Sequence, residues 1–180
     1  MMEIHVTVDK AAVEKKLGDL AGKSRVVISR GINRTAKDAR KRLAEKAQET
    51  YTVKKIRFNR ELKIVNSNAG NLTAILKANG SPLLITAYKH RAARAQGGKA
   101  QILTAGSLKP LDKNGIKAFK KRGMMLQRTS KSRYPLEVLY SNSVPVMLGQ
   151  EQRVYGIVEP HIKSDLEKNI DAAIARLIGG

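Results

Sequence analysis

The feature that most constrains the fold is a run of apolar residues, spaced for one face of a long α-helix, between Ser24 and about Glu49. Successive members are three or four residues apart, the spacing that brings side chains onto one helix face. Gly31 lies inside the run and costs roughly 1 kcal/mol relative to alanine, so it marks a kink, a close packing contact or a tolerated glycine. We therefore predict an amphipathic helix with the apolar stripe Ile28, Ile32, Ala36, Ala39, Leu43 and Ala47.

The basic residues of this helix mostly lie off the apolar stripe. Four of them recur at spacings of three or four, so their side chains share a face. This face either binds an acidic partner or DNA, or is simply a solvated surface. The residues are Arg30, Arg34, Lys37 and Lys41.

The N-terminus predicts a strand followed by a short helix. Apolar and polar residues alternate over residues 3–8, a period of two that is typical of a half-buried strand. Asp9 can then cap a helix that runs to about Leu20, since its carboxylate can accept hydrogen bonds from the first-turn amides.

The middle of the chain predicts mostly antiparallel β-structure. Residues 52–62 form either a short helix or a basic loop, and we favour the helix. Residues 62–80 contain two β-like runs around a turn-rich Asn-Ala-Gly-Asn, which predicts a hairpin. Further short strands are expected over residues 82–87, 102–104, 117–121, 124–128 and 136–140.

The C-terminus predicts a second amphipathic helix that begins at Pro160, because proline suits a first helical turn. Ser164 and Glu167 have the spacing of a capping box. We expect its apolar face to pack on the sheet or on a neighbouring subunit. The residues of this face are Ile162, Leu166, Ile170, Ile174 and Leu177. The fold class expected for residues 1–180 is thus a single α+β domain with a mostly antiparallel sheet and two long amphipathic helices.

The charge is strongly positive and unevenly distributed. The formal net charge is +20, from 35 basic and 15 acidic residues. Residues 1–60 carry 16 basic and 7 acidic side chains, residues 61–142 carry 15 and 3, and residues 143–180 carry 4 and 5. Such an excess predicts a negatively charged partner. Aromatic residues are only 4% of the chain, which argues against stacking of single-stranded bases.

Several function classes are not indicated by any motif. The chain has no cysteine, which excludes disulfides and thiolate metal sites. Gly98 and Lys99 resemble the end of a phosphate-binding loop, but Ala93 and Ala100 replace the glycine and the Ser/Thr that the motif requires. The three histidines lie in separate contexts. No apolar run reaches the roughly 18 residues of a membrane helix, and no signal peptide is recognisable. We expect no enzyme, cofactor, metal site or membrane association, and a protein that is cytosolic when it is made.

Residues 88–101 predict a flexible basic loop. The segment carries several basic side chains and no acidic one, and Gly97 and Gly98 interrupt it. Such a loop can hold DNA through its phosphates, clamp an acidic protein patch or simply stay solvated, and the residue types do not decide between these. Its basic residues are Lys89, Arg91, Arg94 and Lys99.

The segment RGMMLQRTSKSRYPLEVLYSNSVPVML, residues 122–148, has a basic strand ending in LQR, a polar turn, an RYP sequence before an apolar strand, and a VP step into a helix. This pattern resembles the minor tail protein Z family of long-tailed phages, also called tail completion proteins. The likeness extends back to the basic segment 31–62 and covers about residues 30–178. The basic loop and the N-terminal strand depart most from the family pattern.

The resemblance implies a structural virion protein at the head-proximal end of a phage tail, without enzymatic activity. Related neck proteins form rings around the DNA channel. The resemblance therefore implies a homo-oligomeric ring, with a hexamer as the expected form. The implied partners are tail terminator, tail tube or head-tail connector proteins, with genome DNA in the lumen. The alternative, which rests on charge alone, is a general sequence-independent nucleic-acid-binding protein.

Overall fold

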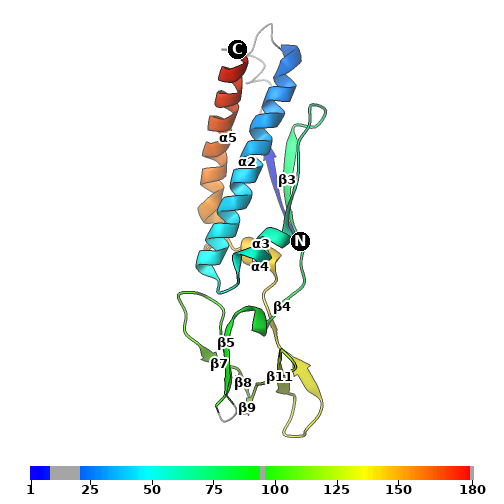
Figure 1. The fold of residues 1–180 in the computed structure, drawn as a ribbon, viewed down its shortest axis with the longest axis vertical. Coiled ribbons are helices and arrows are strands. Elements are labelled where there is room, and N and C mark those ends of the chain that lie inside the picture. Colours follow the sequence, from blue (N-terminus) through cyan, green and yellow to red (C-terminus); the bar gives the residue numbers. More distant parts are fainter. Residues whose placement is uncertain (9–20, 94–95, 179–180) are drawn as a thin grey trace.

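The structure is a computed structural model that describes residues 1–8, 21–93 and 96–178. The molecule is elongated (Figure 1), with a helical part at one end and short β-hairpins at the other. Both helices and antiparallel strands are present, so the predicted α+β class is confirmed. The helix predicted over residues 9–20 lies outside the described residues.

The long helix α2 spans Ala21–Thr50 and confirms the prediction from the apolar stripe. Its stripe residues are fully buried or nearly so, and they form the centre of the main hydrophobic core. Figure 1 shows α2 between the C-terminal helix and a small sheet, which explains why one face carries so many alanines and isoleucines. Gly31 is not merely tolerated, because it makes a close packing contact with the C-terminal helix.

The sheet beside α2 has the strand order β1-β3-β2 and is antiparallel throughout. Its strands are β1 (Met2–Thr7), β2 (Leu62–Val65) and β3 (Thr73–Ala78), so the N-terminal strand and the predicted hairpin are both confirmed. Helix α3 (Lys55–Glu61) precedes β2 and buries Phe58 in the main core. The segment 52–62 is therefore helical over most of its length.

The C-terminal helix α5 spans Tyr155–Ile178, five residues longer at its start than predicted, and follows the short helix α4 (Val144–Leu148). Pro160 consequently lies inside α5, and Ser164 is not a capping residue. The physical reason is that Val154 and Val158 are buried, extending the apolar stripe by one turn before Ile162. The first turns of α5 are held in part by Tyr155 N and Val154 N, which donate to Gln150 O.

The β-rich part is not one sheet, which corrects the sequence prediction. Its strands form four small antiparallel sheets, β10-β11-β12, β13-β4, β5-β6-β7 and β8-β9. A small second core beneath them contains Ile85, Ala100, Ala118 and Met125. The elements are β4 (Leu83–Leu84), a 3-10 turn η2 (Ile85–Ala87), β5 (Lys89–Ala93), β6 (Gly97–Gln101), β7 (Lys109–Pro110), β8 (Asp112–Lys113), β9 (Ile116–Lys117), β10 (Phe119–Lys121), β11 (Met124–Arg128), β12 (Leu136–Val138) and β13 (Tyr140–Ser141).

Four of the predicted short strands differ from prediction. The run 82–87 turns into η2 after two strand residues, and 102–104 makes only an isolated bridge from Leu103 to Tyr51. The runs 117–121 and 136–140 are each split, because the two halves of each run pair with different strands. Ile116–Lys117 pairs with β8 and Phe119–Lys121 with β11, whereas Leu136–Val138 pairs with β11 and Tyr140–Ser141 with β4. The strand 124–128 is confirmed.

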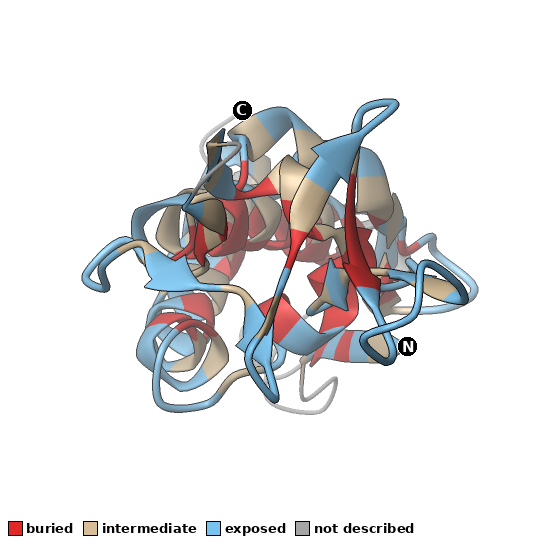
Figure 2. Ribbon diagram, turned by 90° about the horizontal axis from the view of Figure 1, so that it is seen from below, coloured by how far each residue is buried: buried red, intermediate tan, exposed pale blue. Residues whose placement is uncertain are grey.

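The segment 88–101 is a hairpin and not a flexible loop. Strands β5 and β6 pair from Lys89–Gln101 to Ala93–Gly97. Gly97 has φ +78°, and a Cβ on Gly98 would lie 2.7 Å from Met125 Sδ. These glycines therefore serve a tight turn and close packing on the second core, which sequence reasoning mistook for flexibility. Figure 2 shows the molecule from below, with exposed residues on the outer loops and turns and buried residues toward the middle.

Candidate functional site

The β5–β6 hairpin presents a basic face to solvent. Arg91 pairs directly with Lys99, and Lys89 lies two residues before Arg91 on the same side of the strand. Residues opposite each other in an antiparallel ladder are neighbours, and like charges there are unfavourable for folding. Lys89 and Arg91 are exposed, and Lys99 is half-buried. Within the described residues, no ion pair joins these three side chains to a carboxylate. The fold thus carries a local repulsion that an anionic partner would relieve.

The opposite face of this hairpin is packed against protein. Gly98 and Ala100 are buried against Ala118 in the second core. His90 holds the hairpin to its neighbours, because its Nδ1 lies 2.9 Å from Tyr88 O and its Nε2 lies 3.1 Å from Lys120 Nζ. The basic face therefore sits on a fixed support.

Two tight turns bring more basic side chains to the same end of the molecule. Asn114-Gly115 joins β8 to β9 and Arg122-Gly123 joins β10 to β11, and all four residues have positive φ. Positive φ at both central residues is the geometry of a type I′ hairpin turn, for which asparagine-glycine is preferred. Arg122, at φ 49°, is an uncommon choice for the first position. This backbone places an arginine at the apex of an exposed hairpin.

The β-rich end is almost free of negative charge. Between residues 89 and 133 the only acidic residue is Asp112, whose Oδ1 accepts a hydrogen bond from Gly115 N at 2.9 Å. Within this end of the molecule, the sequence prediction named contact residues only in segment 88–101, although lysines and arginines continue through the next three hairpins. The basic residues of this stretch are Lys89, Arg91, Arg94, Lys99, Lys109, Lys113, Lys117, Lys120, Lys121, Arg122, Arg128, Lys131 and Arg133. Arg94 lies outside the described residues.

The basic hairpin is anchored to the end of α2 through Thr52 and Tyr88. Lys89 N donates to Thr52 Oγ1 at 3.0 Å, and Thr52 N donates to Ile102 O at 3.0 Å. Tyr88 is buried and donates its hydroxyl to Asn142 O at 2.7 Å. Burial raises the pKa of Tyr88 to about 12. Both strands of the hairpin are therefore connected to the helical part.

The basic face predicted on α2 is separate from these hairpins. Arg30, Arg34, Lys37 and Lys41 are all exposed, and they follow α2 along the helical part while the β-hairpins lie at the other end (Figure 1). The structure does not bring the two predicted sets together.

The end of the α2 face leads into a concavity that sequence reasoning missed. It has a volume of about 390 Å³ and lies between α2 and α3. Arg40 Nη2 donates to Asn59 O at 2.6 Å, and its Nε is buried without a hydrogen-bond partner. Lys55 Nζ lies 2.8 Å from Glu45 Oε1, and this hydrogen bond lowers the pKa of Glu45. The lining residues are Lys37, Arg40, Lys41, Lys55 and Asn59.

The apolar face of the C-terminal helix packs on α2 of its own chain, and not on the sheet as one of the predicted alternatives had it. Ile162, Ile170 and Ile174 are buried, and Leu166 and Leu177 pack partly buried against the same core. Polar contacts fix the register of the two helices. Arg42 Nε lies 2.9 Å from Asp165 Oδ2, and Asn169 Nδ2 donates to Thr35 Oγ1 at 3.1 Å. This face is occupied within the monomer.

In the part of the chain that the structure describes, no group of three or more His, Asp or Glu side chains is placed to hold a metal ion. Among the same residues, no helix combines the length and apolar character needed to cross a membrane.

Comparison with known proteins returned no match among protein-family models, curated proteins or solved structures.

Proposed function

We propose that the protein is a non-enzymatic structural protein of a phage virion that completes the head-proximal end of a long tail. It takes part in head-tail joining around the DNA channel, as a homo-oligomeric ring with a hexamer as the expected form. Its neighbours would be tail terminator, tail tube or head-tail connector proteins. The resemblance of residues 30–178 to tail completion proteins supports a place in a phage tail. The basic β-hairpins support a contact with an anionic partner.

The observation that carries the proposal is the exposed face with Arg91 opposite Lys99, at an end of the molecule whose charge is almost entirely positive. Duplex DNA carries one phosphate charge per ~1.7 Å of its axis, and lysines and arginines bind it by releasing counterions without reading sequence. Repeated around a ring, such faces would form a positive collar that holds DNA and still lets it slide. The same charges would also suit a clamp on an acidic patch of an adjacent tail ring.

A second candidate is a general sequence-independent nucleic-acid-binding protein that acts as a monomer. The net charge of +20 favours it, since charge of this size attracts any nucleic acid. The two candidates differ in oligomeric state and in the surface that binds DNA, so both properties are measured.

The test compares two triple variants of the full chain. The first changes Arg91, Lys99 and Arg122 to serine on the hairpins, and the matched control changes Arg30, Arg34 and Lys37 to serine on α2. Binding to duplex DNA is measured across salt concentrations, and oligomeric state is measured by size-exclusion chromatography with light scattering. Each lost phosphate contact should reduce the slope of log K against log salt by about 0.9.

In the hairpin variant, we expect the slope of log K against log salt to fall by close to three times this amount. In the α2 variant, the slope should stay unchanged, and both variants should still form the ring. A protein that binds DNA tightly but stays monomeric at all concentrations supports the second candidate instead. In the phage that encodes the protein, a collar predicts that the hairpin variant joins heads to tails but fails in DNA retention or delivery. Failure of joining, without salt-dependent DNA binding by the wild-type protein, would show that the hairpins clamp protein.

A further inference from the structure

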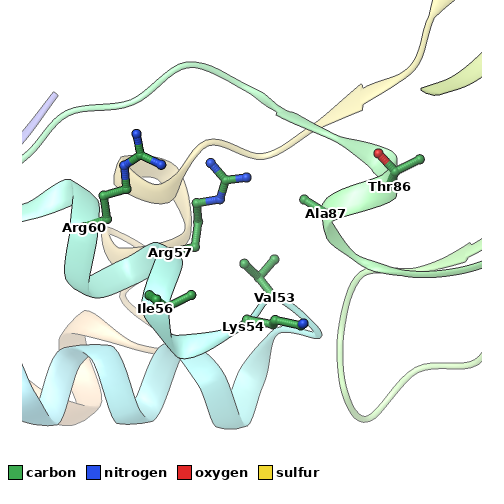
Figure 3. A pocket seen from close by; sticks show the side chains of 7 residues that line it. All are labelled: Val53, Lys54, Ile56, Arg57, Arg60, Thr86 and Ala87. Carbon is green, nitrogen blue, oxygen red and sulfur yellow. The ribbon is translucent and has the colours of Figure 1, made fainter. Parts of the chain in front are cut away.

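A groove between α3 and the β4–η2 segment belongs to neither of the basic surfaces described above. It consists of two adjoining concavities, with volumes of about 360 Å³ and about 390 Å³, that share Arg57, Thr86 and Ala87. One wall is formed by α3 and the residues before it, and the other by residues 81–87. Figure 3 shows Val53 and the side chains of α3 on one side of the opening, and Thr86 and Ala87 on the other.

The groove combines an apolar lining with a basic wall. Val53, Ala87 and Leu83 contribute apolar surface, and Ile56 lies at the opening with 74% of its surface exposed. Apart from Met1, no large hydrophobic residue in the described part of the chain is more exposed than Ile56. The same concavity as Ile56 is lined by the cations Lys54, Arg57 and Arg60. Figure 3 shows the guanidinium groups of both arginines extending away from α3.

Only one acidic residue, Glu61, is among the residues that line the two concavities, so the three cations Lys54, Arg57 and Arg60 outnumber it. Glu61 is half-buried, and its Oε2 is fully buried beside Gly80, where an added Cβ would overlap it. The groove is therefore positive on one side and apolar inside. The pairing of an exposed isoleucine with three cations fits a ligand that carries negative charge next to an apolar side chain.

We propose that this groove docks an acidic segment of a partner protein that inserts an apolar side chain between α3 and η2. A protein segment is favoured over DNA because a phosphate backbone gains nothing from Ile56 or from the apolar lining, whereas a peptide can bury an aliphatic or aromatic side chain there. The basic wall supplies charge complementarity, which orients the segment and speeds its association. This proposal uses residues outside the hairpins and does not depend on the proposed function.

The experiment selects a display library of random linear peptides on the immobilised full-length protein at physiological salt. We expect enriched peptides to pair acidic residues with an aliphatic or aromatic residue. One enriched peptide is then synthesised, and its affinity is measured by fluorescence anisotropy. Ile56→Ser should weaken its binding about tenfold, since a buried isoleucine side chain is lost from the complex. Arg57→Glu combined with Arg60→Glu should weaken it further.

Lys168→Glu combined with Lys63→Glu is the matched control, because both lysines are exposed on other elements and the net charge change is the same. This control should bind the peptide as wild type does, and all variants should keep the wild-type melting temperature. The proposal is overturned if the selection enriches no acidic and apolar pairing, or if Ile56→Ser binds the selected peptide unchanged. It is likewise overturned if duplex DNA displaces the peptide, and if DNA binding is weakened by Arg57→Glu combined with Arg60→Glu but not by Ile56→Ser. If Ile56→Ser abolishes ring formation instead of peptide binding, the occupant is a second copy and the proposal is wrong.

Discussion

The two long helices are in close contact at Gly31, and adding one methyl group there tests how tightly they are held. A Cβ on Gly31 would lie 2.8 Å from Ile170 Cδ1, 3.2 Å from Asn169 O and 3.3 Å from Ile170 Cα. The first contact is with the end of a side chain, which can rotate away. The other two are with the backbone of α5, which has to move as a whole.

Two opposing terms set the expected size of the effect of Gly31→Ala. Replacing glycine by alanine inside a helix stabilises it by about 1 kcal/mol, while overpacking a closely packed contact costs about 1–3 kcal/mol. Because two of the three close atoms are backbone atoms, we expect the second term to win and the free energy of unfolding to fall by about 1 kcal/mol. For a chain of this length, that lowers the melting temperature by about 2–4 °C.

A double-mutant cycle with Ile170→Val identifies the cause. Valine lacks the Cδ1 atom that meets the added methyl, so Ile170→Val should cost about 1 kcal/mol in the wild type and clearly less in the Gly31→Ala background. The expected coupling is at least about 0.5 kcal/mol. Ile162→Val is the matched control, since Ile162 is equally buried on the same face, about 12 Å along the helix from Ile170. Its effect should add to that of Gly31→Ala.

The free energies are measured by urea unfolding followed by far-ultraviolet circular dichroism. The reasoning fails if Gly31→Ala stabilises the protein by the full helix-propensity gain, because the contact would then be loose. It also fails if Ile170→Val and Gly31→Ala are additive, because the methyl would then not be meeting Ile170.

Two further predictions concern the β-rich end. Arg122→Asn should raise the free energy of unfolding by about 0.5–1 kcal/mol in thermal unfolding, because asparagine accepts a positive φ more readily than arginine. The same change should weaken DNA binding. A lower stability would contradict the type I′ assignment. Tyr88 has its pKa raised from 10.0 to about 12, so the stability it contributes is fully present below pH 10 and is lost as the pH rises toward 12. Tyr88→Phe should cost about 1 kcal/mol near neutral pH through the lost hydrogen bond, and urea unfolding from pH 10 to 12 should show a smaller alkaline loss than in wild type.

The elements that the sequence predicted well are those in which one local pattern determines the outcome. The apolar stripe of α2 has a period that only a helix can place on one face, and the alternation in β1 permits only a strand with one buried side. The start of α5 was misjudged because Pro160 was taken as a helix start. Val154 and Val158 are buried on the same stripe, and this tertiary packing carries the helix past the proline.

The basic hairpin was misjudged because its glycines have two meanings that sequence cannot separate. Gly97 and Gly98 are compatible with a flexible loop, yet here one provides a positive φ and the other makes room for Met125. Met125 is 27 residues further along the chain, so the reason for Gly98 is a contact between distant segments. The α3 groove was missed for the same reason, because its walls come from residues 53–60 and 81–87. By contrast, the signal for Arg122 was present in Arg122-Gly123, a glycine-containing turn between two short strands.

Three departures from what local folding favours occur at the same end of the molecule. Arg91 faces Lys99 across a ladder, Arg122 adopts a backbone conformation that suits asparagine or glycine, and Asp112 is the only acidic residue between residues 89 and 133. Each lowers the stability of the isolated chain, and departures of this kind are expected where a protein meets its partner. In the helical part, Arg42, Lys46 and Lys55 are paired with carboxylates, whereas Arg30, Arg34, Lys37 and Lys41 are exposed on α2. An anionic partner at the hairpins would offset the cost of all three departures, which is why we propose the hairpins as the anion contact ahead of α2.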